Sequence, residues 1–264
     1  MQPTDPLCMY VCKIERVRYT RVPIRYIFYP PMPYTLELCS GTGSFSTVMA
    51  QHGFTPITVD NDPIFHPTHL TDVRTFDYKT LYPDPNHFTH IWASPPCTMY
   101  SNAKRAGTRD FETADAIVQR CLDIIHYYNP KVWCLENPFT GYLKTREVVH
   151  GLPFHKVHYC QYEDEGRKKA TALWTNQPGF IGRQCPGPGK CKQMIGRKHR
   201  ATPTGLYWDP TWKSMKGRAI ACARVPPSLI ISLFFPELSS SSEEPSTEIS
   251  SEEETEKKIQ GSNP

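Results

Sequence analysis

The sequence predicts an α/β fold built on a largely parallel sheet, and three observations support this prediction. Short apolar segments alternate with amphipathic ones through residues 34–236, as expected of strands and helices packed in layers. A Gly-x-Gly loop, Gly41 to Gly43, separates the first expected strand from the first expected helix, which is where α/β folds bring their backbone close to a nucleotide. No apolar run approaches the roughly eighteen residues of a transmembrane helix, so we expect no membrane partner.

Each expected element follows from a local residue pattern. Short buried strands are predicted over residues 35–39, 57–59, 88–93, 132–135, 157–160 and 171–174. A further short strand is predicted in the segment HLTDV (residues 69–73), with Asp72 at its end. A helix is predicted over residues 44–52 and is stopped by Gly53. The clearest helix is predicted over residues 112–128, because one stripe carries its apolar residues, and Asn129-Pro130 ends it. Pro226-Pro227 opens a last helix through Phe234.

The chain divides into three predicted parts. Residues 1–33 are a basic and aromatic extension, either an arm that grips nucleic acid or a poorly ordered lead-in. Residues 34–236 form the folded domain, and residues 237–264 are a Ser/Glu-rich tail that we expect to be disordered. A solvated terminus is favoured for this tail over an autoinhibitory mimic of DNA.

Charge and cysteine content indicate the partner and the compartment. The chain carries +4, and the tail has eight Glu and two Lys, or −6, so residues 1–236 carry +10. A basic body suits a polyanionic partner. The N-terminus has no basic segment followed by an apolar run, so we expect an intracellular protein without a secretory signal. Its ten cysteines are then expected to be reduced thiols, except where they serve catalysis or a metal.

The glycine loop predicts a cofactor site. Asp60 lies nineteen residues after Gly41, at the end of the second expected strand, where a carboxylate bonds a ribose hydroxyl. Two cofactors compete, NAD and S-adenosylmethionine. Ser46 stands where a dinucleotide loop has its third glycine, and Glu37 at the loop entrance would repel a pyrophosphate but attract the ammonium of a methionine-like group. The loop therefore favours S-adenosylmethionine.

Asp72 is placed to reach the adenine amino group, although a turn or capping role is an equal alternative. Further contacts are expected from both sides of the loop and from the strand ends beside it. The residues expected to bind the cofactor are Glu37, Cys39, Ser40, Gly41, Thr42, Gly43, Ser44, Asp60, Asn61, Asp72, Val73, Ser94 and Pro95.

Two later strands end in residues suited to covalent catalysis. Pro95 and Pro96 stiffen a loop that aims Cys97 from the end of an apolar strand, which makes this thiol a candidate nucleophile. Glu136 is expected just beyond the end of the next strand, and its apolar flanks suggest a carboxyl that holds a proton near neutral pH. A plain loop and a salt-bridged or capping carboxylate are the structural alternatives.

In this order, the glycine loop, Asp60, Ser94-Pro95-Pro96-Cys97 and Glu136-Asn137-Pro138 resemble the DNA (cytosine-5) methyltransferases, most closely the compact form of large DNA viruses and phages. The resemblance covers about residues 33–235. It implies a Rossmann-like class I S-adenosylmethionine-dependent methyltransferase fold with a reduced target-recognition region. It also implies that Cys97 adds to cytosine C6, that Glu136 bonds N3 and the exocyclic amine, and that Asn137 holds their loop. The cytosine of double-stranded DNA is flipped out of the duplex for this reaction.

The resemblance leaves one set of side chains open. The family has Gln-x-Arg-x-Arg in a basic strand near the base, and here Arg167, Lys168 and Lys169 stand in its place, so any of the three is a candidate substrate contact. Cys39 replaces the usual Phe on the adenine, Thr98 replaces Gln after Pro-Cys, and Pro138 replaces Val after Glu-Asn. None of these departures removes a group that makes or breaks bonds.

A short segment takes the place of the long recognition insertion of bacterial family members. Residues 177–224 are available for it, and residues 177–200 hold six cations without an acid, so we expect phosphate binding that weakens steeply with salt. Cys185, Cys191 and His199, with Cys160 upstream, could fold around structural zinc, although reduced structural thiols are the favoured alternative.

Three other functions compete with this interpretation. Ser-Pro-Pro followed by an aromatic residue marks amino methyltransferases, but Cys97 stands at the aromatic position and Glu136 has no role in that chemistry. RNA cytosine is a second possible substrate, and a non-catalytic DNA-binding protein that keeps the fold is a third possibility. The joint presence of both loop glycines, Asp60, Cys97 and Glu136 favours a catalyst, which we expect to be a monomer.

Overall fold

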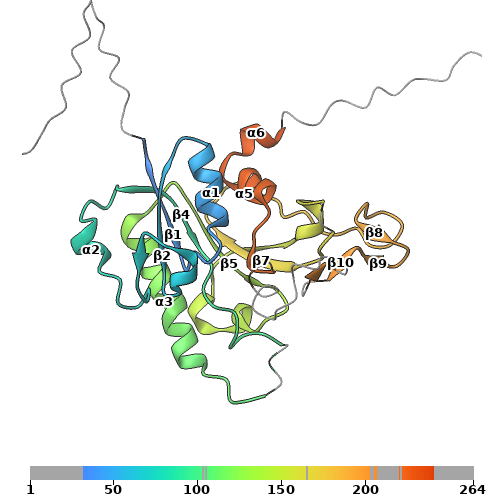
Figure 1. The fold of residues 1–264 in the computed structure, drawn as a ribbon, viewed down its shortest axis with the longest axis horizontal. Coiled ribbons are helices and arrows are strands. Elements are labelled where there is room, and N and C mark those ends of the chain that lie inside the picture. The colour runs from blue at the N-terminus through green and yellow to red at the C-terminus, as the bar shows by residue number, and fades with distance from the viewer. Residues whose placement is uncertain are drawn as a thin grey trace, which may run out of the picture. The chain divides into compact units, whose positions relative to one another are not determined.

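In the computed structural model, the described residues are 32–102, 104, 106–164, 166–202, 205–206, 220 and 222–240. They form a seven-stranded sheet with helices on both faces and two small two-stranded sheets (Figure 1). Apart from residues 32 and 33, the expected N-terminal extension lies outside the described residues, as does the expected tail from residue 241 onward. Among the described residues, no helix combines the length and the apolar composition that a bilayer crossing requires.

The seven-stranded sheet has the order β3-β2-β1-β4-β5-β7-β6. Its strands are β1 (Tyr34–Leu38), β2 (Thr55–Asp60), β3 (His69–Leu70), β4 (Phe88–Ala93), β5 (Val132–Pro138), β6 (Phe154–His158) and β7 (Ala170–Thr175). The first five are parallel, while β7 runs antiparallel to both β5 and β6. The strand order reverses between β1 and β4, the point at which open α/β sheets bind ligands beyond the carboxyl ends of their strands. The expected α/β class with a largely parallel, Rossmann-like sheet is confirmed.

Successive side chains of a strand point to opposite faces of the sheet. Both faces of this sheet carry apolar side chains, so helices cover both. Helices α1 (Ser44–Gln51) and α5 (Pro227–Phe234) pack over the face that buries Trp92 and Leu173. Helix α3 (Phe111–Tyr128) packs on the other face, against Leu36 and Leu38. Each of these four side chains is at most 1% exposed, and burying one contributes about 1.5–3 kcal/mol to stability. The helices packed on the two faces fix the positions of the carboxyl ends of the parallel strands.

Shorter elements complete the described part. They are helices α2 (Tyr78–Leu81) and α6 (Pro236–Ser240), 3-10 helices η1 (Pro63–Phe65), η2 (Leu143–Thr145), η3 (Glu147–Val149) and η4 (Tyr159–Gln161), and strands β8 (Met194–Ile195), β9 (Lys198–His199), β10 (Ala201–Thr202) and β11 (Gly205–Leu206). Strands β8 and β9 form a hairpin that projects from the body beyond β10 (Figure 1).

The main helices begin and end within one residue of their predicted bounds. Gly53, with a φ of 80°, follows α1, and Asn129, with a φ of 41°, ends α3, so both stop signals act through left-handed backbone. Strands β1 and β4 likewise lie where apolar runs predict them.

Several predicted boundaries are wrong: β2 begins at Thr55 and β6 at Phe154, before the predicted starts at residues 57 and 157. Strand β5 continues to Pro138, because antiparallel β7 pairs with it as far as Pro138 and Thr171, so Glu136 lies inside the strand rather than beyond it. Strand β6 ends at His158, and the residues after it turn into η4. The expected tail begins inside α6, since residues 236–240 are helical.

Candidate active site

The loop between β1 and α1 is shaped to approach a ligand. Cys39, Gly41 and Gly43 have φ values of 53°, 47° and 66°, a left-handed conformation that glycine adopts without strain. The backbone N–H of Gly41 donates to Asp60 Oδ2 at 2.8 Å, and the N–H of Asp62 donates to Oδ1 at 2.8 Å. A Cβ added to Gly41 or Gly43 would meet no heavy atom within 4 Å. The loop is therefore ordered by Asp60 and borders open space that a cofactor could fill.

Glu37 holds the first turn of α1, which directly follows this loop. Its carboxylate accepts hydrogen bonds from the backbone N–H groups of Phe45 at 3.3 Å and Ser46 at 2.9 Å, and from the Ser46 hydroxyl. A carboxylate here stabilises the N-terminus of α1. Burial raises the pKa of Glu37 to about 7, although these hydrogen bonds act in the opposite direction. The expected contact with a cofactor ammonium stays a prediction.

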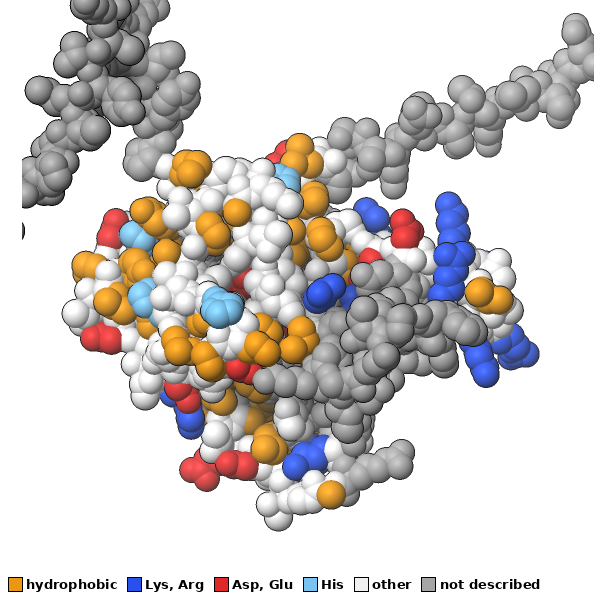
Figure 2. Space-filling view, viewed as in Figure 1, with side chains coloured by type: hydrophobic (Ala, Val, Ile, Leu, Met, Phe, Trp, Pro, Cys, Tyr) orange, Lys and Arg blue, Asp and Glu red, His pale blue; other side chains and the backbone are white. Residues whose placement is uncertain are grey.

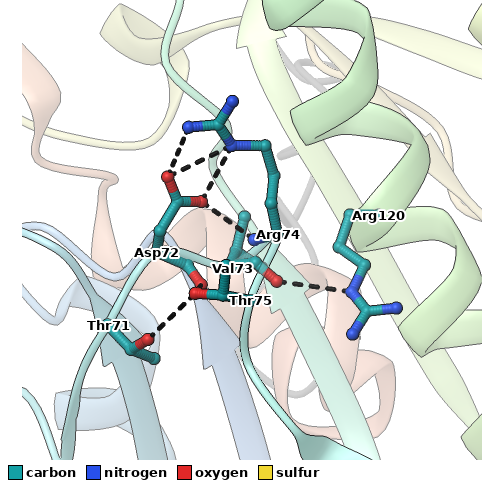
Figure 3. Close-up of polar contacts among 6 residues, drawn as sticks. All are labelled: Thr71, Asp72, Val73, Arg74, Thr75 and Arg120. Atoms are coloured by element: carbon teal, nitrogen blue, oxygen red, sulfur yellow. Dashed lines mark hydrogen bonds and ion pairs between the residues drawn. The ribbon is translucent and has the colours of Figure 1, made fainter.

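Asp72 lies beyond β3 in a loop held by two arginines (Figure 3). Arg74 donates to both carboxylate oxygens of Asp72, with Nη2 at 2.6 Å from Oδ2, and these bonds lower the pKa of Asp72. Arg120 of α3 reaches the carbonyls of Val73 at 3.4 Å and Phe76 at 2.9 Å. The sequence analysis missed both arginines, because neither belongs to a motif. The adenine contact of Asp72 stays a prediction.

The loop after β4 is tied directly to β5. Asn137 Nδ2 donates to the carbonyl of Pro95 at 2.9 Å, so the strand that carries Glu136 holds the loop that carries Cys97. Burial raises the pKa of the Cys97 thiol, the Glu136 carboxylate raises it further, and the Lys169 ammonium lowers it. The predicted nucleophile and acid thus share one electrostatic environment, and the resting thiol is protonated at neutral pH.

Glu136 is buried, with 5% of its surface exposed, and is held by two groups. Lys169 Nζ lies 3.2 Å from Glu136 Oε1, and the Tyr159 hydroxyl donates to the same oxygen at 3.3 Å. Burial raises the pKa of the Tyr159 phenol. Tyr159 carries no motif and was missed by the sequence analysis.

The three cations before β7 have three different surroundings. Lys169 pairs with Glu136, whereas Arg167 is 2% exposed and donates to both carboxylate oxygens of Glu163, at 2.9 and 2.8 Å. Lys168 is exposed, and its charge adds to burial in lowering the pKa of His199. Among the three sequence candidates, Lys169 is the one that the structure brings to the thiol and carboxyl.

A second cluster lies next to this basic segment. The ligand atoms of Cys160, Cys185, Cys191 and His199 all lie within 4.8 Å of one another. His199 Nε2 is 3.3 Å from Cys185 Sγ and 3.6 Å from Cys191 Sγ. Burial lowers the pKa of His199. Burial alone would raise the pKa of Cys185, but hydrogen bonds from Gly187 and neighbouring thiols lower it.

Fold and site together define a class of protein: a Rossmann-like α/β protein with a thiol just beyond one strand of its sheet and a buried carboxyl on the neighbouring strand. No protein-family model matches the chain. It is 33% identical over 219 residues to the protein named "Probable DNA (cytosine-5)-methyltransferase" of Frog virus 3 (isolate Goorha), with 75% of this chain and 97% of the viral protein covered. The chain belongs to the DNA (cytosine-5)-methyltransferase family.

Solved structures with related chains are more distant. The Entamoeba histolytica methyltransferase EhMeth is 13% identical with a TM-score of 0.44, and the match covers 59% of this chain and 57% of that one. A Spodoptera frugiperda DNMT2 mutant is 16% identical with a TM-score of 0.36, and the match covers 57% and 53%. This chain therefore spans little more than half of each of these solved chains.

Proposed function

We propose that this protein transfers a methyl group from S-adenosylmethionine to C5 of cytosine in double-stranded DNA through a covalent bond from Cys97. One observation carries the proposal: Asn137 ties the Cys97 loop to the strand of Glu136. The Cys97 loop follows β4, which borders the switch point and pairs with β1 as far as Leu38 and Ala93, so this loop and the glycine loop leave neighbouring strand ends. Family membership supports the same chemistry.

The reaction needs a nucleophile and an acid on opposite edges of the pyrimidine. The Cys97 sulfur adds to C6, which makes C5 electron-rich enough to take a methyl group, while Glu136 holds a proton at N3. Loss of the C5 proton and release of the thiolate then restore the enzyme. Once Glu136 hydrogen-bonds N3, its charge no longer opposes ionisation of Cys97, and Lys169 favours the thiolate. The base must leave the duplex to reach these groups.

The glycine loop fits the cofactor. S-adenosylmethionine supplies an electrophilic methyl group when it is bound. Gly41 and Gly43 leave open space above their backbone, and Asp60 fixes the loop at the carboxyl end of β2. We assign the adenosyl side to Asp60 and Asp72, and the methionine side to the loop of residues 39–44.

The β8–β9 hairpin is the proposed contact with duplex DNA. Lys192, Arg197 and Lys198 are exposed on it, and Ile195 at its tip is 73% exposed. Figure 2 shows Lys and Arg side chains gathered around this projecting end of the molecule. Cations suit phosphates, and a large apolar side chain between them suits a groove or a base step. The DNA substrate places the activity inside the cell, in the host cytoplasm or nucleus if the protein is viral.

We further propose that the second cluster holds structural zinc. A tetrahedral Cys₃His site with ordinary bond lengths separates sulfur from nitrogen by about 3.6 Å, and the two such distances here are 3.3 and 3.6 Å. A neutral His199 and a lowered Cys185 pKa match what a metal requires of its ligands. Cys160, Cys185, Cys191 and His199 would hold the ion and anchor the base of the hairpin.

Trapping with 5-fluorocytosine tests the proposed reaction. Fluorine at C5 cannot leave as the proton does, so an enzyme of this mechanism stays bonded to the oligonucleotide in the presence of S-adenosylmethionine. We expect a denaturation-resistant adduct with wild type and none with Cys97→Ser, and single-stranded and RNA versions of the oligonucleotide to react poorly.

Each competing function has its own outcome. Methylation of DNA without an adduct supports an amino methyltransferase. Adduct formation on RNA alone supports an RNA enzyme. DNA binding without transfer or cofactor binding supports a non-catalytic protein. Any of these three results overturns the proposal.

A further inference from the structure

We propose that Tyr159 is a positioning residue for the methyl-transfer reaction, holding Glu136 so that its second oxygen faces the cytosine. This inference rests on the proposed function and deepens it. Tyr159 lies in η4, between β6 and the basic segment, and its side chain is fully buried. No motif marks it, and it reaches Glu136 from the turn that follows β6, a strand that β7 separates from β5.

The first support is which oxygen is held. Within the described part of the chain, the Tyr159 hydroxyl at 3.3 Å and the Lys169 ammonium at 3.2 Å both contact Glu136 Oε1. With Oε1 occupied by two donors, Oε2 is the oxygen left for a base. The Tyr159 hydroxyl, together with the Lys169 ammonium, therefore sets which carboxyl oxygen is available to the base.

The second support is that Tyr159 also fixes Lys169. The Tyr159 backbone N–H donates to the Lys169 carbonyl at 3.1 Å. The Lys169 ammonium lies 4.9 Å from the centre of the Tyr159 ring, within the range of a cation–π contact. One residue thus sets the position of both members of the ion pair, through its backbone, ring and hydroxyl.

The third support is the rigidity of the turn itself. The backbone N–H groups of Tyr162 and Glu163 both donate to the Tyr159 carbonyl, at 2.8 and 3.1 Å. Glu163 in turn holds Arg167 with two hydrogen bonds. The next residue, Cys160, belongs to the proposed zinc cluster. The turn is therefore pinned on both sides, as a positioning element requires.

Tyr159→Phe is the test, because it removes one oxygen and keeps the ring. Tyr162→Phe is the matched control, since Tyr162 is buried in the same turn but its hydroxyl accepts from the backbone N–H of Arg183 at 2.7 Å. The measurements are the rate of adduct formation with 5-fluorocytosine DNA, kcat, KM for S-adenosylmethionine and the melting temperature. Losing a hydrogen bond to a charged group slows a reaction by about tenfold or more.

We expect Tyr159→Phe to lower kcat and the adduct rate about tenfold, with KM for S-adenosylmethionine within about twofold of wild type, and Tyr162→Phe to keep its rate. The inference is overturned if Tyr159→Phe reacts as fast as wild type. It is also overturned if kcat falls in both variants to the extent that their melting temperatures fall, because a merely structural role predicts that result. A wild type that forms no adduct overturns the proposed function itself.

Discussion

Replacing Lys169 with methionine removes the charge next to Glu136 and keeps most of the side-chain volume. The two side chains are 13% and 7% exposed and their charged atoms are 3.2 Å apart. At an effective dielectric constant of about 20, this separation gives an attraction of about 5 kcal/mol, from which desolvation of both groups must be subtracted. Removing one partner of a buried pair costs about 3–5 kcal/mol, because the other charge is left without compensation.

The melting temperature measures this cost. At about 2–4 °C per kcal/mol for a domain of this size, a loss of about 3–5 kcal/mol means that Lys169→Met should melt about 6–20 °C below wild type. The control is Lys168→Met, which removes an exposed lysine one position earlier and should change stability by less than about 0.5 kcal/mol. Combining Lys169→Met with Glu136→Gln should recover about 2 kcal/mol of the summed single-variant losses, because neither charge then remains. Equal melting of the two lysine variants, or additive losses in the double variant, would refute the reasoning.

Three further predictions follow from the described contacts. Burial raises the pKa of Glu37 from 4.5 to about 7, so between these pH values the native state binds more protons than the unfolded state. The free energy of unfolding of wild type should therefore fall by about 3 kcal/mol between pH 4.5 and 7 relative to that of Glu37→Gln. Urea unfolding at several pH values measures this difference. Gly166→Ala should destabilise more than Gly53→Ala in the same assay, because both glycines have a φ of 80° but only at Gly166 would the new Cβ lie 2.7 Å from a side-chain atom, Arg200 Cβ. Asn137→Ala should lose about 1 kcal/mol and slow adduct formation, since the bond to Pro95 is broken.

The proposed cysteine and histidine site predicts the metal content of the protein. Purified protein should contain about one zinc per chain, and Cys191→Ser should lower the metal content measured by mass spectrometry. Absence of zinc from wild type purified without chelators would contradict the proposed site.

Residues that follow directly on a strand could be predicted from the sequence. The glycine loop, Cys97 and Asp60 each come at the end of an apolar run, and parallel strands bring such ends to one edge of the sheet. Strand and helix positions followed from periodicity and from stop signals such as Gly53. These features are local in sequence, so single-sequence reasoning reaches them.

Features that depend on pairing between distant segments could not be predicted. The length of β5 depends on β7, and the choice of Lys169 among three neighbouring cations depends on which side of that segment faces Glu136. Tyr159 and Arg74 act through contacts that no motif records. The residue types and their spacing in the sequence identified the four metal-ligand candidates. Their convergence in space depends on how η4 and the β8–β9 hairpin pack together.

The antiparallel direction of β7 explains why a cation precedes this strand rather than follows it. In the register with β5, Pro138 lies opposite Thr171 and Cys134 opposite Thr175, so the start of β7 lies at the carboxyl end of β5. A parallel strand would present its last residues there and send the preceding segment to the far edge of the sheet. Because β7 runs the other way, Lys169 enters the strand beside Glu136, and the chain just before it is free to pack against η4 and the cysteine cluster. The reversal thus joins the acid, its counter-charge and the proposed recognition hairpin at one edge of the sheet.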